Sequence, residues 1–484
     1  MFEGGEWMNR KKLVIRGWLK FNFYSEGNIE TIELQNFNYK TMIHNTKKMT
    51  LGYFSLICFL AANLVGAQTT SSSKEKGEIR VMQKYEREIG SIAKHAKIQK
   101  AFKTIEDLEP QTNKEHIMLT EIPAPPFKEE VRAAKYADLL KEAGADSVWI
   151  DEVGNVIGLR HGTSGEFTVA LDAHLDTVFP EGTDVTVMKK GDTLMAPGIG
   201  DDTRGLMVVL TVLRALEQND IKTKSDVLFI GTVGEEGLGD LRGVKHLFNE
   251  QEPGIDSWIA VDGGDMAGIS HRGLGSHRYR VTFKGPGGHS WGAFGMVNPH
   301  HALGRAIKYF TAEADRFSRS GERVSYSIGR IGGGTSVNSI PFESWMEVDM
   351  RSENIEQLED MDQLLQKAVQ KALQEENKVK REGPDLSVDV EMVGDRPSGK
   401  IAVENSLVQK AMATAAFFGA TPSLRAGSTD SNIPIARGIP AVTIGRGGTG
   451  GGSHSLQEWW INKKGHLAIQ RALLLLLSEA GVMN

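Results

Sequence analysis

The sequence predicts an α/β protein whose main domain contains a mainly parallel sheet and is interrupted by a smaller α+β domain. Short apolar runs alternate with helical patterns between residues 127 and 274, and again between residues 395 and 484. Such alternation is typical of a parallel sheet that is covered by helices on both faces. Between these two stretches, residues 275–394 follow the order β-α-β-β-α-β, which is the ferredoxin-like arrangement.

Apolar spacing and stop signals predict the elements of the main domain. The helix from Phe127 to Ala143 repeats apolar residues at helical spacing, and Gly144 follows where a helix should stop. Further helices are predicted at Arg204–Gln218, Leu241–Asn249, Glu404–Phe418 and Gly465–Ala480. The predicted strands are Ser147–Asp151, Val156–Leu159, Thr168–Ala173, Val227–Thr232, Trp258–Asp262 and Ala441–Ile444.

The inserted domain is predicted to contain two helices and four strands. Asn298 and Pro299 form an N-cap and first-turn pair for a helix that runs through Phe317. A long amphipathic helix follows at Ile355–Glu375. The strands are His277–Phe283, Arg323–Arg330, Ser344–Arg351 and Leu386–Val393.

We therefore divide the chain into five segments. They are an upstream extension with a signal peptide (1–67), a linker and N-terminal helix (68–110), the first segment of the main catalytic domain (111–274), the inserted domain (275–394) and the second segment of the main domain (395–484). The N-terminal helix is expected to run unbroken from Ile79 to about Leu108.

The N-terminal region carries the pattern of a secretory signal peptide. Lys47 and Lys48 precede an apolar run from Leu51 to Ala67, which ends in small residues suited to cleavage before Gln68. The run is short for a membrane-spanning helix, which needs roughly 20 apolar residues, although an uncleaved anchor is the alternative. We therefore expect an exported protein, periplasmic or extracellular, without a stable membrane span.

Composition excludes several classes of function. The net charge of -6, without a basic run, gives no reason to expect a nucleic-acid partner. Cys58 is the only cysteine and lies inside the apolar run, so the exported chain would contain none. Thiol catalysis, disulfides and cysteine-ligated zinc are thereby excluded.

Five side chains of the metal-binding type stand in short glycine-rich stretches in or just after apolar runs: His174, Asp201, Glu236, Asp262 and His454. In open α/β sheets, ligands bind outside the carboxyl ends of the strands. Two imidazoles and two carboxylates divided between two ions, with a third carboxylate shared, provide the N/O ligation that zinc accepts. The sequence therefore predicts a metal site with more than one ion.

Carboxylates beside these residues have separate roles. Asp176 shares a strand face with His174, so it is placed to orient the imidazole rather than to bind metal. Asp201 precedes the predicted helix and can bridge two ions, whereas Asp202 or Thr203 can cap that helix.

Glu235 and Glu236 are adjacent, so their side chains are not expected to face the same point. One can bind metal while the other acts as the general base of metal-assisted hydrolysis.

Seven short motifs occur in order along the chain: ALDAHLDTV, PGIGDDTRG, GTVGEEG, VDGG, GPGGHS, TSVNSIP and GGGSHS. Together they resemble metallopeptidase family twenty, which includes peptidase T, glutamate carboxypeptidase, carnosinases, aminoacylases and succinyl-diaminopimelate desuccinylase. The resemblance runs from about Asn113 to the C-terminus. Each motif is loose, but seven in the right order are specific.

The resemblance implies two co-catalytic zinc ions, with cobalt or manganese as alternatives. Asp201 would bridge the ions, and the peptide bond after it would be cis. One ion would bind His174 and Asp262, and the other Glu236 and His454. An aspartate at Asp262 is closer to peptidase T and the carnosinases than to deacetylase-type members, which more often have glutamate.

The same resemblance implies roles for five further residues. Glu235 would be the general base and Asp176 the orienter. The inserted domain resembles the family's lid or dimerisation domain, so a homodimer is expected, with His289 stabilising the oxyanion, often from the other subunit. Asn338 and Arg351 would hold the substrate's carboxylate, because the planar guanidinium matches a carboxylate bidentately.

The function that follows is zinc-dependent hydrolysis of an amide bond in small peptides, of the di- or tripeptidase exopeptidase type. A water between the two ions would attack, and Glu235 would remove its proton. The alternative on the same fold is an N-acyl amino acid amidohydrolase. Whether the amino or the carboxyl end of the substrate is recognised stays open.

A serine hydrolase is the rival from another class. Residues 288–292 match the G-x-S-x-G elbow around Ser290, and Asp430 and His454 follow in the order of a triad. The elbow requires a strand directly before the serine and a helix directly after it, yet Pro286 and two glycines precede, and the next predicted helix starts only at Pro299. A chelator and a serine-directed phosphonate would separate the two classes.

A zinc-binding protein without catalysis is a third possibility. Glu235 beside Glu236 argues against it, because binding alone needs only the ligand.

Overall fold

The computed structural model describes residues 19–25, 28–34, 80–250 and 254–483, and the chain forms two compact units, Met1–Ile79 and Arg80–Asn484. In the first unit, strands β1 (Leu19–Ser25) and β2 (Asn28–Leu34) pair antiparallel. The predicted signal peptide lies outside the described residues. Among the residues described, no helix combines the length and apolar character needed to cross a membrane.

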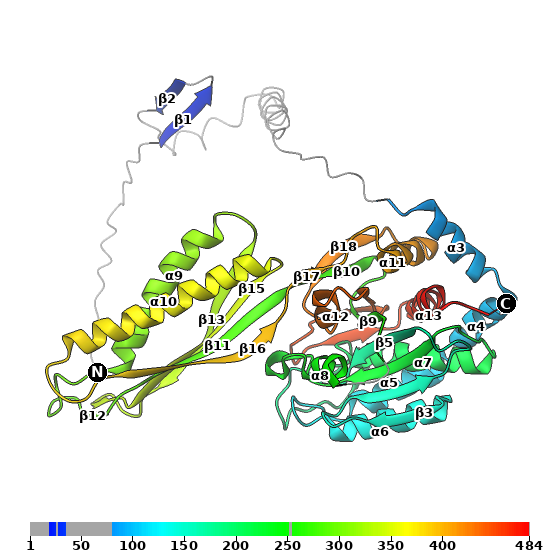
Figure 1. Ribbon diagram of the computed structural model, residues 1–484, viewed down its shortest axis with the longest axis horizontal. Coiled ribbons are helices and arrows are strands. Elements are labelled where there is room, and N and C mark those ends of the chain that lie inside the picture. Colours follow the sequence, from blue (N-terminus) through cyan, green and yellow to red (C-terminus); the bar gives the residue numbers. More distant parts are fainter. Residues whose placement is uncertain (1–18, 26–27, 35–79, 251–253, 484) are drawn as a thin grey trace, which may run out of the picture. The chain divides into compact units, whose positions relative to one another are not determined.

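A nine-stranded mixed sheet forms the centre of the second unit (Figure 1). Its middle strands lie in the order β19, β9, β5 and β8 and run parallel. Every residue of β5 is buried, so both faces of the sheet are covered. This arrangement confirms the predicted fold class. The strands are β3 (Ser147–Ile150), β4 (Val156–Arg160), β5 (Thr168–His174), β8 (Asp226–Thr232), β9 (Ser257–Gly263), β10 (Gly268–Gly273), β17 (Gly399–Lys400), β18 (Ser423–Gly427) and β19 (Ala441–Gly445).

Helices from both ends of the sequence cover this sheet. Helices α7 (Thr203–Gln218) and α13 (His466–Ala480) are almost entirely buried, and both contact β5 and each other. The segments before and after the insertion therefore share one hydrophobic core. The other helices of this domain are α5 (Glu109–Thr120), α6 (Glu130–Ala143), α8 (Arg242–Glu250), α11 (Ser406–Phe417) and α12 (Asn432–Ala436).

The prediction of a single N-terminal helix is wrong. Two helices, α3 (Gln83–Ala93) and α4 (Ala96–Asp107), are separated at His95, whose backbone is extended. Ile89 of α3 and Ile98 of α4 are both fully buried in the main core. Helix α3 packs against α11 and α13, whereas α4 packs mainly against α7 and also contacts α13. The break lets each apolar face reach a different part of that core.

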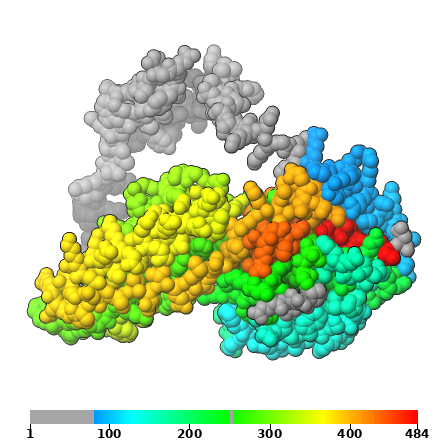
Figure 2. Space-filling view, viewed as in Figure 1, coloured from blue at the N-terminus to red at the C-terminus, as the bar shows by residue number. Residues whose placement is uncertain are grey.

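The inserted domain has its own sheet and its own core. Its strands lie in the order β13, β15, β11 and β16, all antiparallel, and the two helices pack on this sheet and against each other (Figure 1). Alternate residues of β15 are buried, as expected for a sheet with one covered face. On the face shown in Figure 2, one continuous stretch of sequence forms the surface of this domain, whereas the main domain's surface mixes distant segments. The elements are β11 (Gly275–Lys284), α9 (Pro299–Ser318), β13 (Val324–Gly333), β15 (Glu343–Ser352), α10 (Ile355–Val379) and β16 (Ser387–Arg396).

The core of the inserted domain makes a stability prediction. Phe310 of α9 is 0% exposed, and its ring lies edge-on to Tyr326 with centroids 5.3 Å apart. We expect Phe310→Ala to lower the free energy of unfolding by about 3–5 kcal/mol, because transfer energy is lost and a cavity forms. Urea denaturation measures the loss. The control is Phe342→Ala, at a residue that is 54% exposed, and equal losses in the two variants would contradict the assignment of Phe310 to the core.

Candidate metal centre

The order of the parallel strands brings distant polar residues to one edge of the sheet. His174 ends β5, Asp262 lies near the end of β9, and Glu235 and Glu236 follow β8. His454 lies further along the segment that follows β19, between β20 (Thr449–Gly451) and β21 (Trp459–Ile461). Because β19, β9, β5 and β8 are neighbours, their carboxyl ends meet at the same edge.

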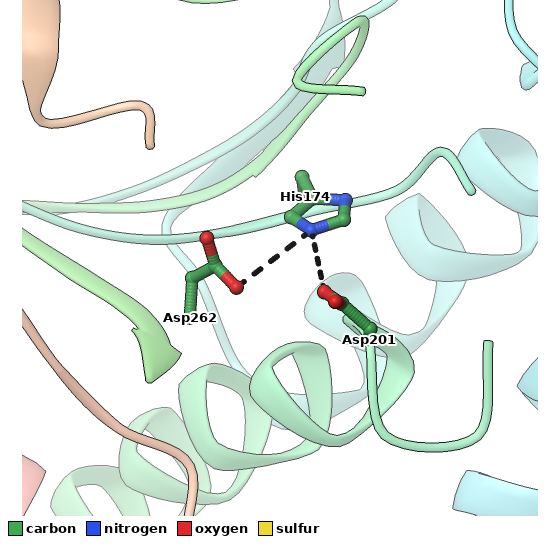
Figure 3. Close-up of side chains that lie close together, drawn as sticks. All are labelled: His174, Asp201 and Asp262. Carbon is green, nitrogen blue, oxygen red and sulfur yellow. Dashed lines mark hydrogen bonds and ion pairs between the residues drawn. The ribbon is translucent and has the colours of Figure 1, made fainter. Parts of the chain in front are cut away.

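Three groups of potential metal ligands form at this edge. One combines His174 with Glu235 and Glu236, and the other two, called the clusters below, share Asp201. In the first cluster, His174 Nε2 lies 3.2 Å from Asp201 Oδ1 and 3.9 Å from Asp262 Oδ1 (Figure 3). In the second, His454 Nε2 lies 2.9 Å from Glu236 Oε1 and 3.4 Å from Asp201 Oδ2. In each cluster the ligand atoms lie within 4.8 Å of one another. Asp201 therefore directs one carboxylate oxygen to each cluster.

The residue after Asp201 has a different task. Asp202 is the N-cap of α7 and accepts the N–H of Gly205 at 3.2 Å. The sequence predicted that Asp202 or Thr203 caps this helix. The peptide bond between Asp201 and Asp202 is cis, as the family resemblance implied.

Asp176 connects His174 to the loop of the two glutamates. Its carboxylate accepts the N–H of Glu235 at 3.0 Å and the N–H of Glu236 at 2.8 Å. His174 Nδ1 contacts the main-chain carbonyl of Asp176 at 3.0 Å, whereas the nearest carboxylate oxygen is 3.7 Å away. Donation from Nδ1 to that carbonyl leaves Nε2 free to accept a metal. The orienting contact thus comes from the backbone, and the carboxylate holds the glutamate loop.

Burial changes the acidity of the carboxyl groups. Burial and the charge of Asp201 raise the pKa of Asp262 to about 7. The pKa of Glu235 also lies well above its ordinary value, because burial outweighs the attraction of Arg396. Burial acts on Asp201 in the same direction, but Arg446 and two histidines outweigh it and hold the pKa of Asp201 well below its usual range. Neighbouring buried carboxylates disfavour one another's ionisation. A divalent cation bound between them would stabilise their ionised forms.

The pKa values of the two imidazoles are also raised, but the cause is neighbouring negative charge and not burial. Burial alone would lower the pKa of His174, but its hydrogen bond to Asp201 and neighbouring negative charges raise it well above the ordinary value. Hydrogen bonds to Asp201 and Glu236 raise the pKa of His454 to about 10. Because a ligating imidazole must be neutral, metal binding at these residues would release protons.

Arg446 is a site residue that sequence reasoning missed. Its Nη1 lies 3.2 Å from Asp262 Oδ1, 3.3 Å from Asp201 Oδ1 and 3.4 Å from Asp202 Oδ1. It directly follows β19, so its position at a strand end was the available signal. The guanidinium offsets part of the negative charge that these three carboxylates concentrate.

Glu458 was also missed, and no sequence pattern could have found it. Its carboxylate accepts the N–H groups of Gly198 at 2.7 Å, Gly200 at 3.0 Å and Asp201 at 2.9 Å. Glu458 is 1% exposed and precedes β21 (Trp459–Ile461). The loop that carries Asp201 is therefore shaped by a residue more than two hundred positions later in the chain.

Not all predicted substrate residues join the clusters. A cavity of about 380 Å³ is lined by residues of both clusters and by Arg351. His289 and Asn338 are exposed on the inserted domain and do not line this cavity. They lie beside the short pairing of β12 (Gly288–His289) with β14 (Ser339–Ile340). Within one chain, Arg351 therefore lies at the site, whereas His289 and Asn338 lie outside it.

Arg278 and Arg396 also line the cavity. Asp349 orients both Arg278 and Arg351. Asp349 accepts a hydrogen bond from Arg278 Nε at 2.9 Å and from Arg351 Nε at 2.7 Å. These two arginines lower the pKa of Asp349, although burial acts against them. The cavity therefore has an acidic wall at the clusters and a basic wall on the inserted domain.

The serine-hydrolase triad does not form. Ser290 is exposed on the inserted domain, where its N–H donates to the carbonyl of Asn338 at 2.9 Å. His454 instead contacts Glu236 and Asp201.

Comparison with known proteins identifies the family. The sequence model that describes peptidase family M20/M25/M40 matches residues 170–478, which is more than half of the chain. The chain belongs to this family. The resemblance inferred from the seven motifs is thereby confirmed, and the protein is a hydrolase of the family.

Three relatives illustrate how far the likeness extends. The uncharacterized protein YqjE of Bacillus subtilis is 25% identical over 329 residues, which cover 66% of this chain and 84% of that protein. The aminopeptidase PepT of Bacillus cereus has a TM-score of 0.59 at 22% identity, covering 76% of this chain and 98% of its own. The YXEP protein of Bacillus subtilis, a dinuclear metal-binding peptidase, has a TM-score of 0.54 at 18% identity, covering 78% and 99%. At these identities the two solved structures share the fold.

The contacts of Glu458 lead to a prediction about metal affinity. Glu458→Gln replaces three charge-assisted hydrogen bonds to the Asp201 loop with weaker ones. We expect metal affinity to fall about tenfold to a hundredfold, as for other residues that support metal ligands. Competition with a chelating dye measures it. Glu152→Gln, at an exposed site, is the control, and equal affinities in the two variants would contradict a supporting role for Glu458.

Proposed function

We propose that this family member is an exopeptidase with two zinc ions that cleaves small peptides of two or three residues. The observation that carries the proposal is the placement of Asp201, which offers one oxygen to each of two ligand clusters. Each cluster combines imidazole and carboxylate donors, the mixture that zinc accepts, with cobalt or manganese as alternatives. The dinuclear metal-binding peptidase from Bacillus subtilis, which shares the fold, supports a site for two ions.

The first ion would be held by His174, Asp201 and Asp262, and the second by Asp201, Glu236 and His454. When bound, two divalent cations would supply Lewis-acid activation of a water and of the scissile carbonyl.

Glu235 would move the proton in this reaction. Its side chain lines the cavity and belongs to neither cluster around Asp201, although a carboxylate oxygen of Glu235 lies within 4.8 Å of ligand atoms of His174 and Glu236. The carboxylate receives a proton from the attacking water and passes it to the leaving amine. Asp176 supports this role because it binds the N–H groups of Glu235 and Glu236 and so holds them in fixed directions.

Arg351 would bind the free carboxylate of the substrate. Its Nε donates to Asp349, and the residue lines the cavity. The cavity volume of about 380 Å³ suits a short substrate. An N-acyl amino acid is the second candidate, because it also presents a free carboxylate to Arg351. The aminopeptidase with this fold favours the peptide.

A homodimer would complete the site. His289 and Asn338 lie exposed on the inserted domain, away from the cavity of their own chain. We propose that a second copy brings both to the cavity, where His289 stabilises the oxyanion and Asn338 contacts the substrate's carboxylate. Export to the periplasm or the extracellular space is a further proposal, which rests on the signal-peptide pattern of the sequence.

Glu235→Gln tests the division of labour between the two glutamates. We expect turnover to fall about a hundredfold or more, because the general base is lost, while zinc content stays that of the wild type. Peptide hydrolysis and elemental analysis of the same samples measure the two quantities. A parallel loss of zinc and activity would contradict the assignment.

Inhibitors separate the enzyme classes in the wild-type protein. A chelator should abolish hydrolysis, and added zinc should restore it. A serine-directed phosphonate should have no effect, and inhibition by it would favour the serine hydrolase.

Mixing two inactive variants tests the dimer. His289→Ala should lower turnover without changing zinc content. If a second copy supplies His289, exchanging subunits between His289→Ala and Glu235→Gln forms heterodimers with one intact site, and about a quarter of all sites regain activity. No recovery in verified heterodimers would place His289 in the site of its own chain or outside the mechanism.

A further inference from the structure

Arg396 is a buried arginine with no role in the function proposed above. It is the last residue of β16, is 3% exposed, and lines the cavity beside the metal clusters. Its Nη1 donates to Glu235 Oε1 at 3.1 Å and to Ser428 Oγ at 3.1 Å. Its Nη2 donates to the main-chain carbonyl of Glu235. One guanidinium thus binds both the side chain and the backbone of the proposed base.

Glu235 is held from two sides as a result. Asp176 accepts its N–H on one side, and Arg396 binds its carbonyl and one carboxylate oxygen on the other. The second oxygen, Oε2, accepts no hydrogen bond from any described residue, and Glu235 lines the cavity. A carboxylate with one oxygen fixed and one free has a defined orientation and can still exchange a proton.

The main chain that carries Arg396 is itself attached to the glutamate loop. The N–H of Asp395 donates to Asp240 Oδ1 at 2.9 Å, and Lys245 Nζ donates to the carbonyl of Asp395 at 2.9 Å. Asp240 directly follows the short helix η1 (Gly237–Gly239), which begins after Glu236. These bonds limit how far the guanidinium can shift relative to Glu235, so the contact is well suited to positioning.

We propose that Arg396 is a positioning residue for hydrolysis: it fixes the direction of the Glu235 carboxylate towards the metal clusters without binding substrate or metal. The proposal rests on the function assigned to Glu235 above. The inserted domain would therefore contribute to catalysis in its own chain through Arg396, at the end of β16. This contribution is separate from that proposed for His289 of a second copy.

The main experiment measures turnover, KM and zinc content for Arg396→Gln and Arg396→Lys. For Arg396→Gln we expect kcat to fall about tenfold to a hundredfold, because small misplacement of a catalytic group has such a cost. KM and zinc content should stay near the wild-type values. Arg396→Lys keeps the charge but loses the planar fork, so its kcat should be intermediate.

Arg160 provides a matched control outside the site. It is 3% exposed and binds the same types of partner: Glu217 Oε1 at 2.6 Å, the carbonyl of Ile221 at 2.6 Å and Thr223 Oγ1 at 3.3 Å. Arg160→Gln should lower the thermal midpoint, as the loss of any buried ion pair does, while kcat stays near the wild-type value. An equal loss of kcat in both variants would overturn a specific role for Arg396.

A second measurement does not depend on activity. In the metal-free protein, urea midpoints are compared for the wild type, Arg396→Gln, Glu235→Gln and the double variant. If the two side chains interact as the structure shows, the shifts are not additive, and the double variant is no less stable than Arg396→Gln. Additive shifts would overturn the contact.

The outcomes of the kinetic experiment are distinct. A raised KM with unchanged kcat would make Arg396 a substrate-binding residue, and loss of zinc would make it a support of the metal ligands; either overturns the proposal. An inactive Glu235→Gln beside a fully active Arg396→Gln overturns only the role of Arg396. Absence of metal-dependent hydrolysis in the wild type would overturn the proposed function and this role with it.

Discussion

The concentration of buried negative charge at one edge of a parallel sheet is the constraint on which the rest of this structure depends. Asp201, Glu236 and Asp262 converge with two imidazoles within a few ångströms, and burial opposes ionisation of such groups. Cations must offset this charge. Arg446 supplies one within the chain, and the two metal ions proposed above would supply the others.

Much of the surrounding structure keeps these groups at fixed positions. Glu458 binds the loop of Asp201, and Asp176 binds the loop of Glu235 and Glu236. In both cases a carboxylate accepts backbone N–H groups, which is a strong, charge-assisted interaction. The site therefore depends on residues outside the ligand set, which decide where the ligands point.

Side chains of the inserted domain contact this centre, in addition to the chain connections between the two domains. Its sheet presents Arg278 and Arg351 to the cavity, with Asp349 setting the direction of both. Arg396, at the end of β16, reaches the proposed base itself. The basic wall of the cavity thus belongs to the inserted domain and the acidic wall to the main domain, so a substrate with a free carboxylate would contact both.

By itself, the sequence determined the α/β class, most strands and helices of the two domains, and the candidate metal ligands that the structure brings together. Apolar periodicity and strand-end motifs are local signals, and they suffice where a residue's role follows from its own segment, as for His174 at the end of β5. Only the tertiary structure placed Arg446, Glu458 and Arg396 in the site. Their roles are contacts between residues far apart in the chain, and a buried arginine or glutamate has the same local pattern whichever distant partner it meets.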